Sequence, residues 1–411
     1  MGDGGEADLT QLLYRPESFA PLTETSWDEA AVRDGIAEIA ADAEAAFHAD
    51  ELWPADEWDA WETPMPLKML YVGAAGVVWA LDTLRRRGLA GGELDLAQAA
   101  RRTLERRRAE PDLMAGIELP TPPDAALLTG ESGVLAVLWR LVREDAVADE
   151  LLALVRANVD NAADEIMWGS PGTLLAARML LAESGDERWA EAWRESAEAL
   201  LARRDEEGMW TQQLYGATRR SLTPPHGVVG NVLALLGGGD LLPEQTRLEL
   251  AAQTNDVLLR TAVVEDGLVS WPVGEGRPLE GPDGEIRLQW CAGAPGMVAA
   301  AAPYLDEDLL LGGAELTWRA GPHGDEKGAG ICHGTAGNGY AFLKAFERTQ
   351  DERWLERARR FAVHALEQTR RLRERRGRGR YSLWTGDVGV ALYAADCLEA
   401  RTRYPILETW S

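Results

Sequence analysis

The chain has 411 residues, of which 46% are hydrophobic and 27% charged, and its formal net charge is −26. This composition is typical of a globular protein with a large core, and such acidity argues against nonspecific binding to nucleic-acid phosphates. No apolar run approaches the roughly 20 residues that cross a bilayer, and three cysteines do not make a disulfide framework. We therefore expect a cytoplasmic protein without membrane insertion and without a nucleic-acid partner.

Seven glycine pairs with the spacing Gly-x-x-Gly recur along the chain, and each leads into a nearly all-apolar helical run. The pairs are Gly73/Gly76, Gly130/Gly133, Gly169/Gly172, Gly227/Gly230, Gly293/Gly296, Gly334/Gly337 and Gly386/Gly389. A helix that is apolar on nearly every side is buried on most of its surface. We therefore expect seven inner helices that begin at these glycines.

A longer, charged stretch with helical periodicity precedes each glycine pair. These stretches cover about residues 29–49, 94–109, 144–164, 187–204, 243–263, 305–320 and 351–370. Each outer and inner pair can bury its apolar face only against its neighbours, so the repeats predict an all-α fold. The expected architecture is a closed α/α toroid, a seven-fold double-helical barrel. We expect residues 1–28 to form an N-terminal extension and residues 29–411 a single barrel domain.

Two of the three cysteines and one histidine lie in the Gly-rich turns of repeats five and six, as Cys291, Cys332 and His333. On spacing alone, each cysteine is also consistent with a small buried apolar residue, because no CxxC pattern is present. The predicted barrel brings both turns to the same end, which favours a shared metal site. Three protein ligands leave the fourth position of Zn²⁺ open, and this is typical of catalytic rather than structural zinc.

Three motifs resemble the lanthionine synthetase C-like family, which includes the cyclases of lantibiotic biosynthesis and stand-alone eukaryotic relatives. They are WCAGAPG at 290–296, ICHGTAGNGYAF at 331–342 and YSLWTGDVG at 381–389. The resemblance extends over nearly the whole chain. It implies a seven-fold α/α barrel and a Zn²⁺ cofactor held by the Cys of the WC motif and the Cys and His of the CHG motif. Those positions are Cys291, Cys332 and His333 here.

The resemblance also implies roles for three further residues. His226 fits the family's acid/base histidine, although a histidine that only ties a turn together is an alternative. Arg287, four residues before the first cysteine of the site, matches a position of the biosynthetic branch. Lys327, five residues before the second, matches a lysine that helps to hold glutathione in the eukaryotic-like branch.

Two departures from the family's pattern concern the catalytic positions. Ala292 stands where the family often has Tyr or His directly after the first cysteine. The acidic residue expected just ahead of the repeat-two glycines is not at 126 or 127, and Asp124 lies two positions early. Both departures argue against full cyclase chemistry but not against zinc binding.

The activity implied by the resemblance is addition of a thiol to dehydroalanine or dehydrobutyrine in a peptide or protein. The thiol belongs to a peptide cysteine or to glutathione. Arg287 would stabilise the enolate oxygen and His226 would supply the final proton.

A basic island, residues 370–380, precedes the turn of repeat seven. Arg380 is its best-placed member for binding an acidic leader peptide or the carboxylates of glutathione. The alternative is a solvated, flexible loop.

Two other functions remain open from the residues. A zinc-containing protein could bind glutathione or a modified peptide without turnover, and protein prenyltransferases are zinc-containing α/α barrels with Asp, Cys and His ligands. Cys397 is expected to pack in the core, and His323 is expected to be a surface-loop residue.

Overall fold

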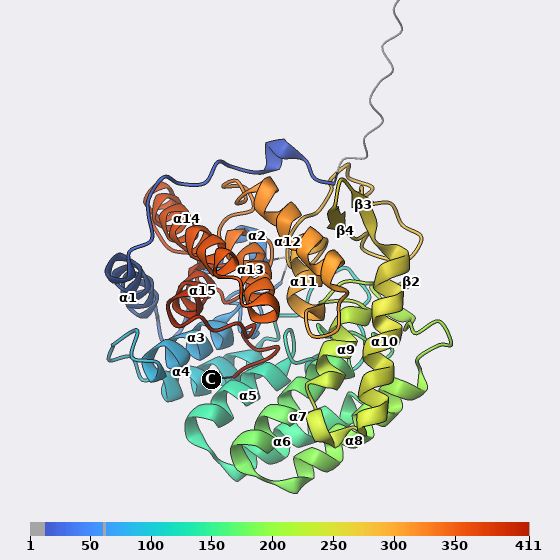
Figure 1. The fold of residues 1–411 in the computed structure, drawn as a ribbon. Coiled ribbons are helices and arrows are strands. Elements are labelled where there is room, and N and C mark those ends of the chain that lie inside the picture. Colours follow the sequence, from blue (N-terminus) through green and yellow to red (C-terminus); the bar gives the residue numbers. More distant parts are fainter. Residues whose placement is uncertain (1–12, 61–62, 411) are drawn as a thin grey trace, which may run out of the picture.

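The computed structural model describes residues 13–60 and 63–410, and within these ranges seven outer and seven inner helices alternate along the chain (Figure 1). The outer helices are α1 (Glu29–Ala45), α4 (Leu96–Ala109), α6 (Asp145–Ala157), α8 (Glu187–Ala202), α10 (Glu244–Thr261), α12 (Glu307–Ala320) and α14 (Glu352–Arg376). The inner helices are α3 (Ala74–Arg86), α5 (Glu131–Val142), α7 (Ser170–Ser184), α9 (Val228–Leu236), α11 (Ala294–Ala301), α13 (Thr335–Thr349) and α15 (Asp387–Glu399).

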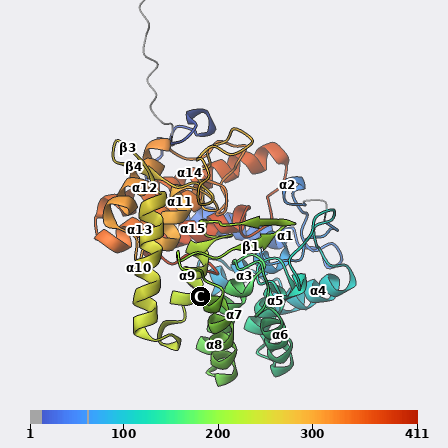
Figure 2. The ribbon, with the colours of Figure 1, turned by 90° about the vertical axis from the view of Figure 1, so that its right-hand side faces the viewer.

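The inner helices form a closed ring. Each one contacts the next inner helix along the chain, and α15 contacts α3 to complete the circle. The outer helices follow the perimeter in chain order, so the first, α1, packs beside the last inner helix, α15 (Figure 1). In the side view, the outer helices α6, α8 and α10 run in a similar direction (Figure 2). These contacts confirm the predicted α/α toroid.

The glycine pairs explain how the inner helices begin. The first glycine of every pair is the N-cap residue of its inner helix. A Cβ on the second glycine would overlap the carbonyl oxygen six residues earlier, which belongs to Leu70 for Gly76 and to Trp290 for Gly296. Because glycine has no Cβ, each helix can start this close to the turn that precedes it.

Neighbouring turns are joined at one end of the ring by backbone hydrogen bonds. The amide of Cys332 donates to the carbonyl of Trp384 (2.7 Å), and the amide of Trp384 donates to Tyr71 (3.2 Å). The amide of Tyr71 in turn donates to the carbonyl of Leu128 (2.9 Å). Each of these residues lies two positions before the first glycine of its repeat. Equivalent residues in the turns of repeats six, seven, one and two are therefore hydrogen-bonded in series.

The C-terminal segment completes the core beside these turns. The ring of Tyr404 lies 5.3 Å from Trp290, 5.7 Å from Trp384 and 4.4 Å from Tyr340, measured between ring centroids. Its hydroxyl donates to the carbonyl of Ile331. The turns of repeats five, six and seven thus pack around one aromatic cluster.

Short elements lie between or outside the two rings. Hairpins β1 (Gln212–Leu214) with β2 (Ala217–Arg219) and β3 (Val263–Glu265) with β4 (Leu268–Ser270) follow α8 and α10, and α2 (Glu57–Ala60) precedes α3. The remaining short elements are 3₁₀ turns, η1 (Pro16–Ser18), η2 (Pro123–Ala125) and η3 (Gly239–Leu241).

The segment before α1 packs on the barrel through the loop that follows α12. The amide of Ala20 donates to the carbonyl of Pro322 (2.8 Å), and the amide of Gly324 donates to Ser18 (3.1 Å). Residues 1–12 of the predicted extension lie outside the described residues, and the division at residue 28 stays a prediction. None of the helices in the described ranges combines the length and the hydropathy needed to cross a membrane.

Candidate metal centre and its surroundings

The structure brings the three predicted metal ligands together. The ligand atoms of Cys291, Cys332 and His333 all lie within 4.8 Å of one another, and Cys332 Sγ is 3.6 Å from His333 Nε2. Cys332 is buried, whereas the side chains of Cys291 and His333 are half-buried. Two thiols and an imidazole converging in this way can hold a metal ion.

The two turns reach this arrangement through different backbone devices. In repeat five, Gln289 and Ala292 exchange backbone hydrogen bonds of 2.9 and 3.1 Å, so Cys291 lies at the tip of a tight turn. Gly293 then enters the helix at a φ of +93°, a conformation that strains any residue with a Cβ. In repeat six, the hydrogen bond from the amide of Cys332 to Trp384 fixes the second thiol.

Both thiols accept a hydrogen bond from a neighbouring side chain. The hydroxyl of Tyr71 donates to Cys332 Sγ (2.8 Å), and Gln289 Nε2 donates to Cys291 Sγ (2.9 Å). The hydrogen bond from Cys332, together with the nearby imidazole of His333, lowers the pKa of the Cys291 thiol well below its usual range. Burial and the neighbouring Cys291 raise the pKa of Cys332. Burial also raises the pKa of Tyr71, so the phenol remains a hydrogen-bond donor.

His226 lies in the turn of repeat four and pairs with a carboxylate from repeat three. Its Nδ1 is 2.7 Å from Glu165 Oε2, and its side chain is 36% exposed while that of Glu165 is fully buried. Glu165 also accepts the backbone amides of Met167 (3.0 Å) and Trp168 (2.6 Å). The carboxylate is therefore fixed on three sides and holds the imidazole in one orientation.

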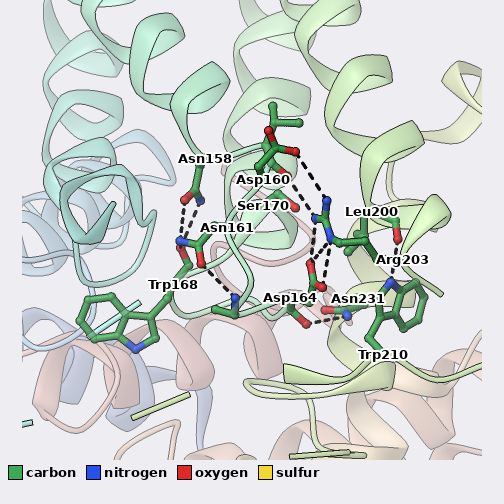
Figure 3. A network of polar contacts seen from close by, with 12 residues as sticks. Asn158, Asp160, Asn161, Asp164, Trp168, Ser170, Leu200, Arg203, Trp210 and Asn231 are labelled. Carbon is green, nitrogen blue, oxygen red and sulfur yellow. Dashed lines mark hydrogen bonds and ion pairs between the residues drawn. The ribbon is translucent and has the colours of Figure 1, made fainter. Parts of the chain in front are cut away.

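A polar network anchors the loop that carries Glu165 (Figure 3). The side chains of Asn158 and Asn161 each donate to the carbonyl of Trp168 at 3.1 Å. Arg203 binds the carboxylate of Asp164, and Asn231 of α9 donates to the Asp164 carbonyl (2.8 Å). Because α9 begins two residues after His226, this network ties the helix that follows the histidine to the loop that holds its partner.

The hairpin β1–β2 adds an aromatic wall beside His226. Tyr215, in the hairpin turn, lies edge-on to the imidazole with 6.4 Å between centroids. Its hydroxyl accepts a hydrogen bond from Trp168 Nε1 (2.8 Å). Burial, with Glu165 nearby, raises the pKa of Tyr215 to about 12. The phenol is therefore neutral and contributes no charge to the His226 and Glu165 pair.

Arg287 and Lys327 come close to each other around one acidic residue. Lys327 Nζ is 3.2 Å from Glu285 Oε2, and the guanidinium of Arg287 is 3.9 Å from the same oxygen. Arg287 also pairs with Asp283. These ion pairs are partly exposed, so they contribute little to stability and can exchange partners. The predicted roles of Arg287 and Lys327 stay predictions.

Arg380 is engaged in a buried ion pair. Its guanidinium donates to both carboxylate oxygens of Asp59, at 2.8 and 2.5 Å, and Thr385 donates to the same carboxylate (2.8 Å). The guanidinium also lies 4.9 Å from the centroid of the Trp58 ring, which makes a T-shaped contact with the His333 ring, with 5.0 Å between the two centroids. Arg380 thus supports the wall beside His333 through α2, and its predicted contact with substrate stays a prediction.

The alternative of a loop for the basic island is wrong for residues 370–376, which are helical, whereas residues 377–380 lie in no helix or strand. Helix α14 continues to Arg376, and Arg371 and Arg375 both pair with Asp325. Arg373 pairs with Asp42 of α1 at 2.8 Å. The arginines therefore attach the end of α14 to α1 and to the loop that carries Asp325.

The structure tests the predicted surroundings of Cys397 and His323. Cys397 is fully buried in α15, as expected. The expectation for His323 is wrong, because this residue is 2% exposed, stacks on Phe19 and lies 3.0 Å from the carbonyl of Leu288 through Nε2. Burial lowers its pKa to about 4.

Sequence reasoning missed four residues around the site, namely Tyr71, Gln289, Trp58 and Glu165. Tyr71 had a signal, since it lies two positions before Gly73, as Cys291 and Cys332 lie before their own glycines. The sequence analysis expects the family's acidic residue ahead of the repeat-two glycines, where Asp124 pairs with Arg107. Glu165, which pairs with His226, lies ahead of the repeat-three glycines and has no such signal.

Comparisons with known proteins agree with the fold and with the motifs. A glutathione S-transferase LANCL1 from Danio rerio is 33% identical over 150 residues, which are 34% of this chain and 36% of that protein. The solved structure of a nisin cyclase matches with a TM-score of 0.58 and 14% identity, covering 89% of this chain and 94% of that one. The family model for lanthionine synthetase C-like proteins matches residues 59–408. The chain therefore belongs to the lanthionine synthetase C-like family.

Proposed function

We propose that this protein binds one zinc ion through Cys291, Cys332 and His333 and catalyses the addition of a thiol to dehydroalanine or dehydrobutyrine. The convergence of the three ligand atoms within 4.8 Å is the observation that carries this proposal. Membership of the family supports it, as do the names of two similar proteins, a nisin cyclase and a glutathione S-transferase.

The donor set fits zinc in both chemistry and size. Thiolate and imidazole are the ligands that zinc prefers. With Zn–S near 2.3 Å and Zn–N near 2.05 Å, a tetrahedron has an S···N edge of about 3.6 Å. The distance between Cys332 Sγ and His333 Nε2 is 3.6 Å. Because these are three ligands, a fourth position would be left for the substrate sulfur.

Bound zinc would supply a place where a substrate thiol loses its proton at neutral pH. The substrate would approach on the side of Cys291 and His333, because these ligands are half-buried while Cys332 is closed off by Tyr71. The protein's own residues then have to exclude water, stabilise developing charge and return a proton.

His226 is the proposed proton carrier. A carbon–sulfur bond forms at the β-carbon, the electron pair of the double bond moves toward the carbonyl, and the α-carbon finally takes one proton. With Nδ1 held by Glu165, the imidazole presents Nε2 as the atom that takes and returns this proton. The thiol gives up one proton and the α-carbon gains one, so no other reactant is needed.

Arg287 and Lys327 are the proposed binding groups for negative charge. Arg287 would exchange its exposed pair with Asp283 for the enolate oxygen, and Lys327 would leave Glu285 for a carboxylate of the substrate. Arg380 would act on the substrate only through Trp58, because its guanidinium is held by Asp59.

The test is incubation with a dehydroalanine peptide and glutathione, followed by mass measurement of the adduct. A second dehydroalanine peptide, which carries its own cysteine, distinguishes ring formation from glutathione addition. Ring formation leaves the mass of the peptide unchanged but removes its free thiol. We expect adduct or ring with the wild type and with Cys397→Ala, and none with Cys332→Ala. Binding of the modified peptide without any thioether would instead favour the alternative of a binding protein. The donor set, Cys/Cys/His rather than Asp/Cys/His, disfavours prenyl transfer.

A further inference from the structure

Each thiol of the metal centre accepts one hydrogen bond from an uncharged, buried side chain. The hydroxyl of Tyr71 is 2.8 Å from Cys332 Sγ, and Gln289 Nε2 is 2.9 Å from Cys291 Sγ. Tyr71 is 4% exposed and Gln289 is 3% exposed, so neither hydrogen bond competes with bulk water. The two donors come from different repeats, one and five.

A hydrogen bond to a thiolate draws electron density away from the sulfur. Such bonds from groups next to the ligands fix ligand orientation and tune the bound metal. Neither a phenol nor an amide adds charge, so the net charge of two thiolates and one imidazole is unchanged. The two hydrogen-bond donors therefore lower the nucleophilicity of the ligand sulfurs without changing the net charge of the three ligands.

This matters because the substrate of the proposed reaction is an electrophile. A dehydroalanine β-carbon placed beside the metal would meet three sulfurs, namely Cys291, Cys332 and the substrate thiol. Only attack by the substrate thiol is productive, since alkylation of a ligand would destroy the site.

We propose that Tyr71 and Gln289 are positioning residues that make the two ligand sulfurs poor nucleophiles, so that the substrate sulfur is the one that reacts. The proposal rests on the proposed metal centre. Tyr71 protects the buried Cys332, and Gln289 protects the half-buried Cys291, which faces the approaching substrate. Burial adds to the protection of Cys332 but not to that of Cys291.

The test uses Co²⁺ alone as the probe, in the metal-free full chain. Thiolate ligands give a sulfur-to-cobalt charge-transfer band, whose energy falls when a hydrogen bond to the sulfur is removed. We expect the band to move to longer wavelength in Tyr71→Phe and in Gln289→Met. Tyr393→Phe is the matched control, because that buried hydroxyl donates to the carbonyl of Ala358 instead (2.8 Å). The control should leave the band in place.

Alkylation of the cobalt-loaded protein by iodoacetamide gives a second readout, with the modified residue located by mass mapping. We expect Gln289→Met to raise alkylation of Cys291 several-fold, and Tyr393→Phe to leave it at the wild-type rate. An unmoved band and unchanged alkylation in both Tyr71→Phe and Gln289→Met would overturn the inference. A wild-type protein that shows no charge-transfer band would overturn the metal centre itself, and the inference with it.

Discussion

Replacing Glu165 by Gln tests whether this carboxylate serves the reaction through His226. Gln has nearly the same shape but no charge, so the charge-assisted hydrogen bond to the imidazole, 2.7 Å long, becomes a neutral one. A hydrogen bond to a charged group contributes about 1.5–3 kcal/mol and a neutral one about 0.5–1.5 kcal/mol, so the substitution removes about 1–1.5 kcal/mol. If that energy is expressed in the transition state, the rate falls about 5- to 13-fold, since each 1.36 kcal/mol is tenfold.

The assay is the rate of thioether formation at saturating peptide, measured for wild type, Glu165→Gln, His226→Asn and the double variant. Because Glu165 acts through His226, its removal should cost nothing further once the imidazole is gone, and the double variant should match His226→Asn. Zinc content and the urea midpoint of Glu165→Gln are measured alongside, to separate a catalytic loss from unfolding. Rate losses that multiply in the double variant, or a wild-type rate for Glu165→Gln, would refute the reasoning.

Three further perturbations test the fold around the site. Gly389→Ala should lower the free energy of unfolding by about 1–3 kcal/mol, because the added Cβ would overlap the carbonyl oxygen of Leu383. Asp59→Ala should cost about 3–5 kcal/mol in urea unfolding, since it leaves the guanidinium of Arg380 buried without its partner. His323→Gln should remove acid sensitivity between pH 6.5 and 4. The pKa of His323 is lowered to about 4 in the fold, so the unfolded chain binds the extra proton and wild-type stability falls by up to about 3 kcal/mol over that window.

Each of these variants has a matched control. A Cβ at Gly91 would meet no atom of the described residues within 4 Å, so Gly91→Ala should be neutral. Arg370→Ala, on the same basic segment as Arg380, breaks an exposed pair with Glu38 and should change stability by less than about 1 kcal/mol. His48→Gln replaces an exposed histidine and should keep the wild-type pH dependence. A control that behaves like its partner variant would contradict the corresponding structural argument.

The repeats could be predicted because they follow from local sequence. An apolar run behind each glycine pair indicates a buried helix, and glycine is required where the helix starts against its own turn, as Gly76 shows against Leu70. Once seven repeats are counted, the ring brings turns five and six to one end. The three metal ligands could therefore be placed from sequence, although Cys291 and Cys332 are 41 positions apart.

The partners of the site residues could not be predicted in this way. Tyr71 reaches Cys332 across 261 positions and Glu165 reaches His226 across 61, and no local pattern links either pair. His323 has the sequence surroundings of a surface loop, but residues far away in the sequence cover it, among them Phe19 from the segment before α1, which stacks on its ring. In the sequence, Arg380 resembles a free binding residue, but in the fold its guanidinium is bound by Asp59 of α2. Such contacts depend on how the ring closes rather than on spacing.

The zinc content of the purified protein tests the central claim most directly. We predict one zinc ion per chain in the wild type and in Cys397→Ala, whose thiol is buried in α15 away from the cluster. Cys332→Ala should retain its helical circular dichroism and lose the metal. A wild-type protein without zinc, or a Cys332→Ala variant that keeps the full complement, would contradict the account.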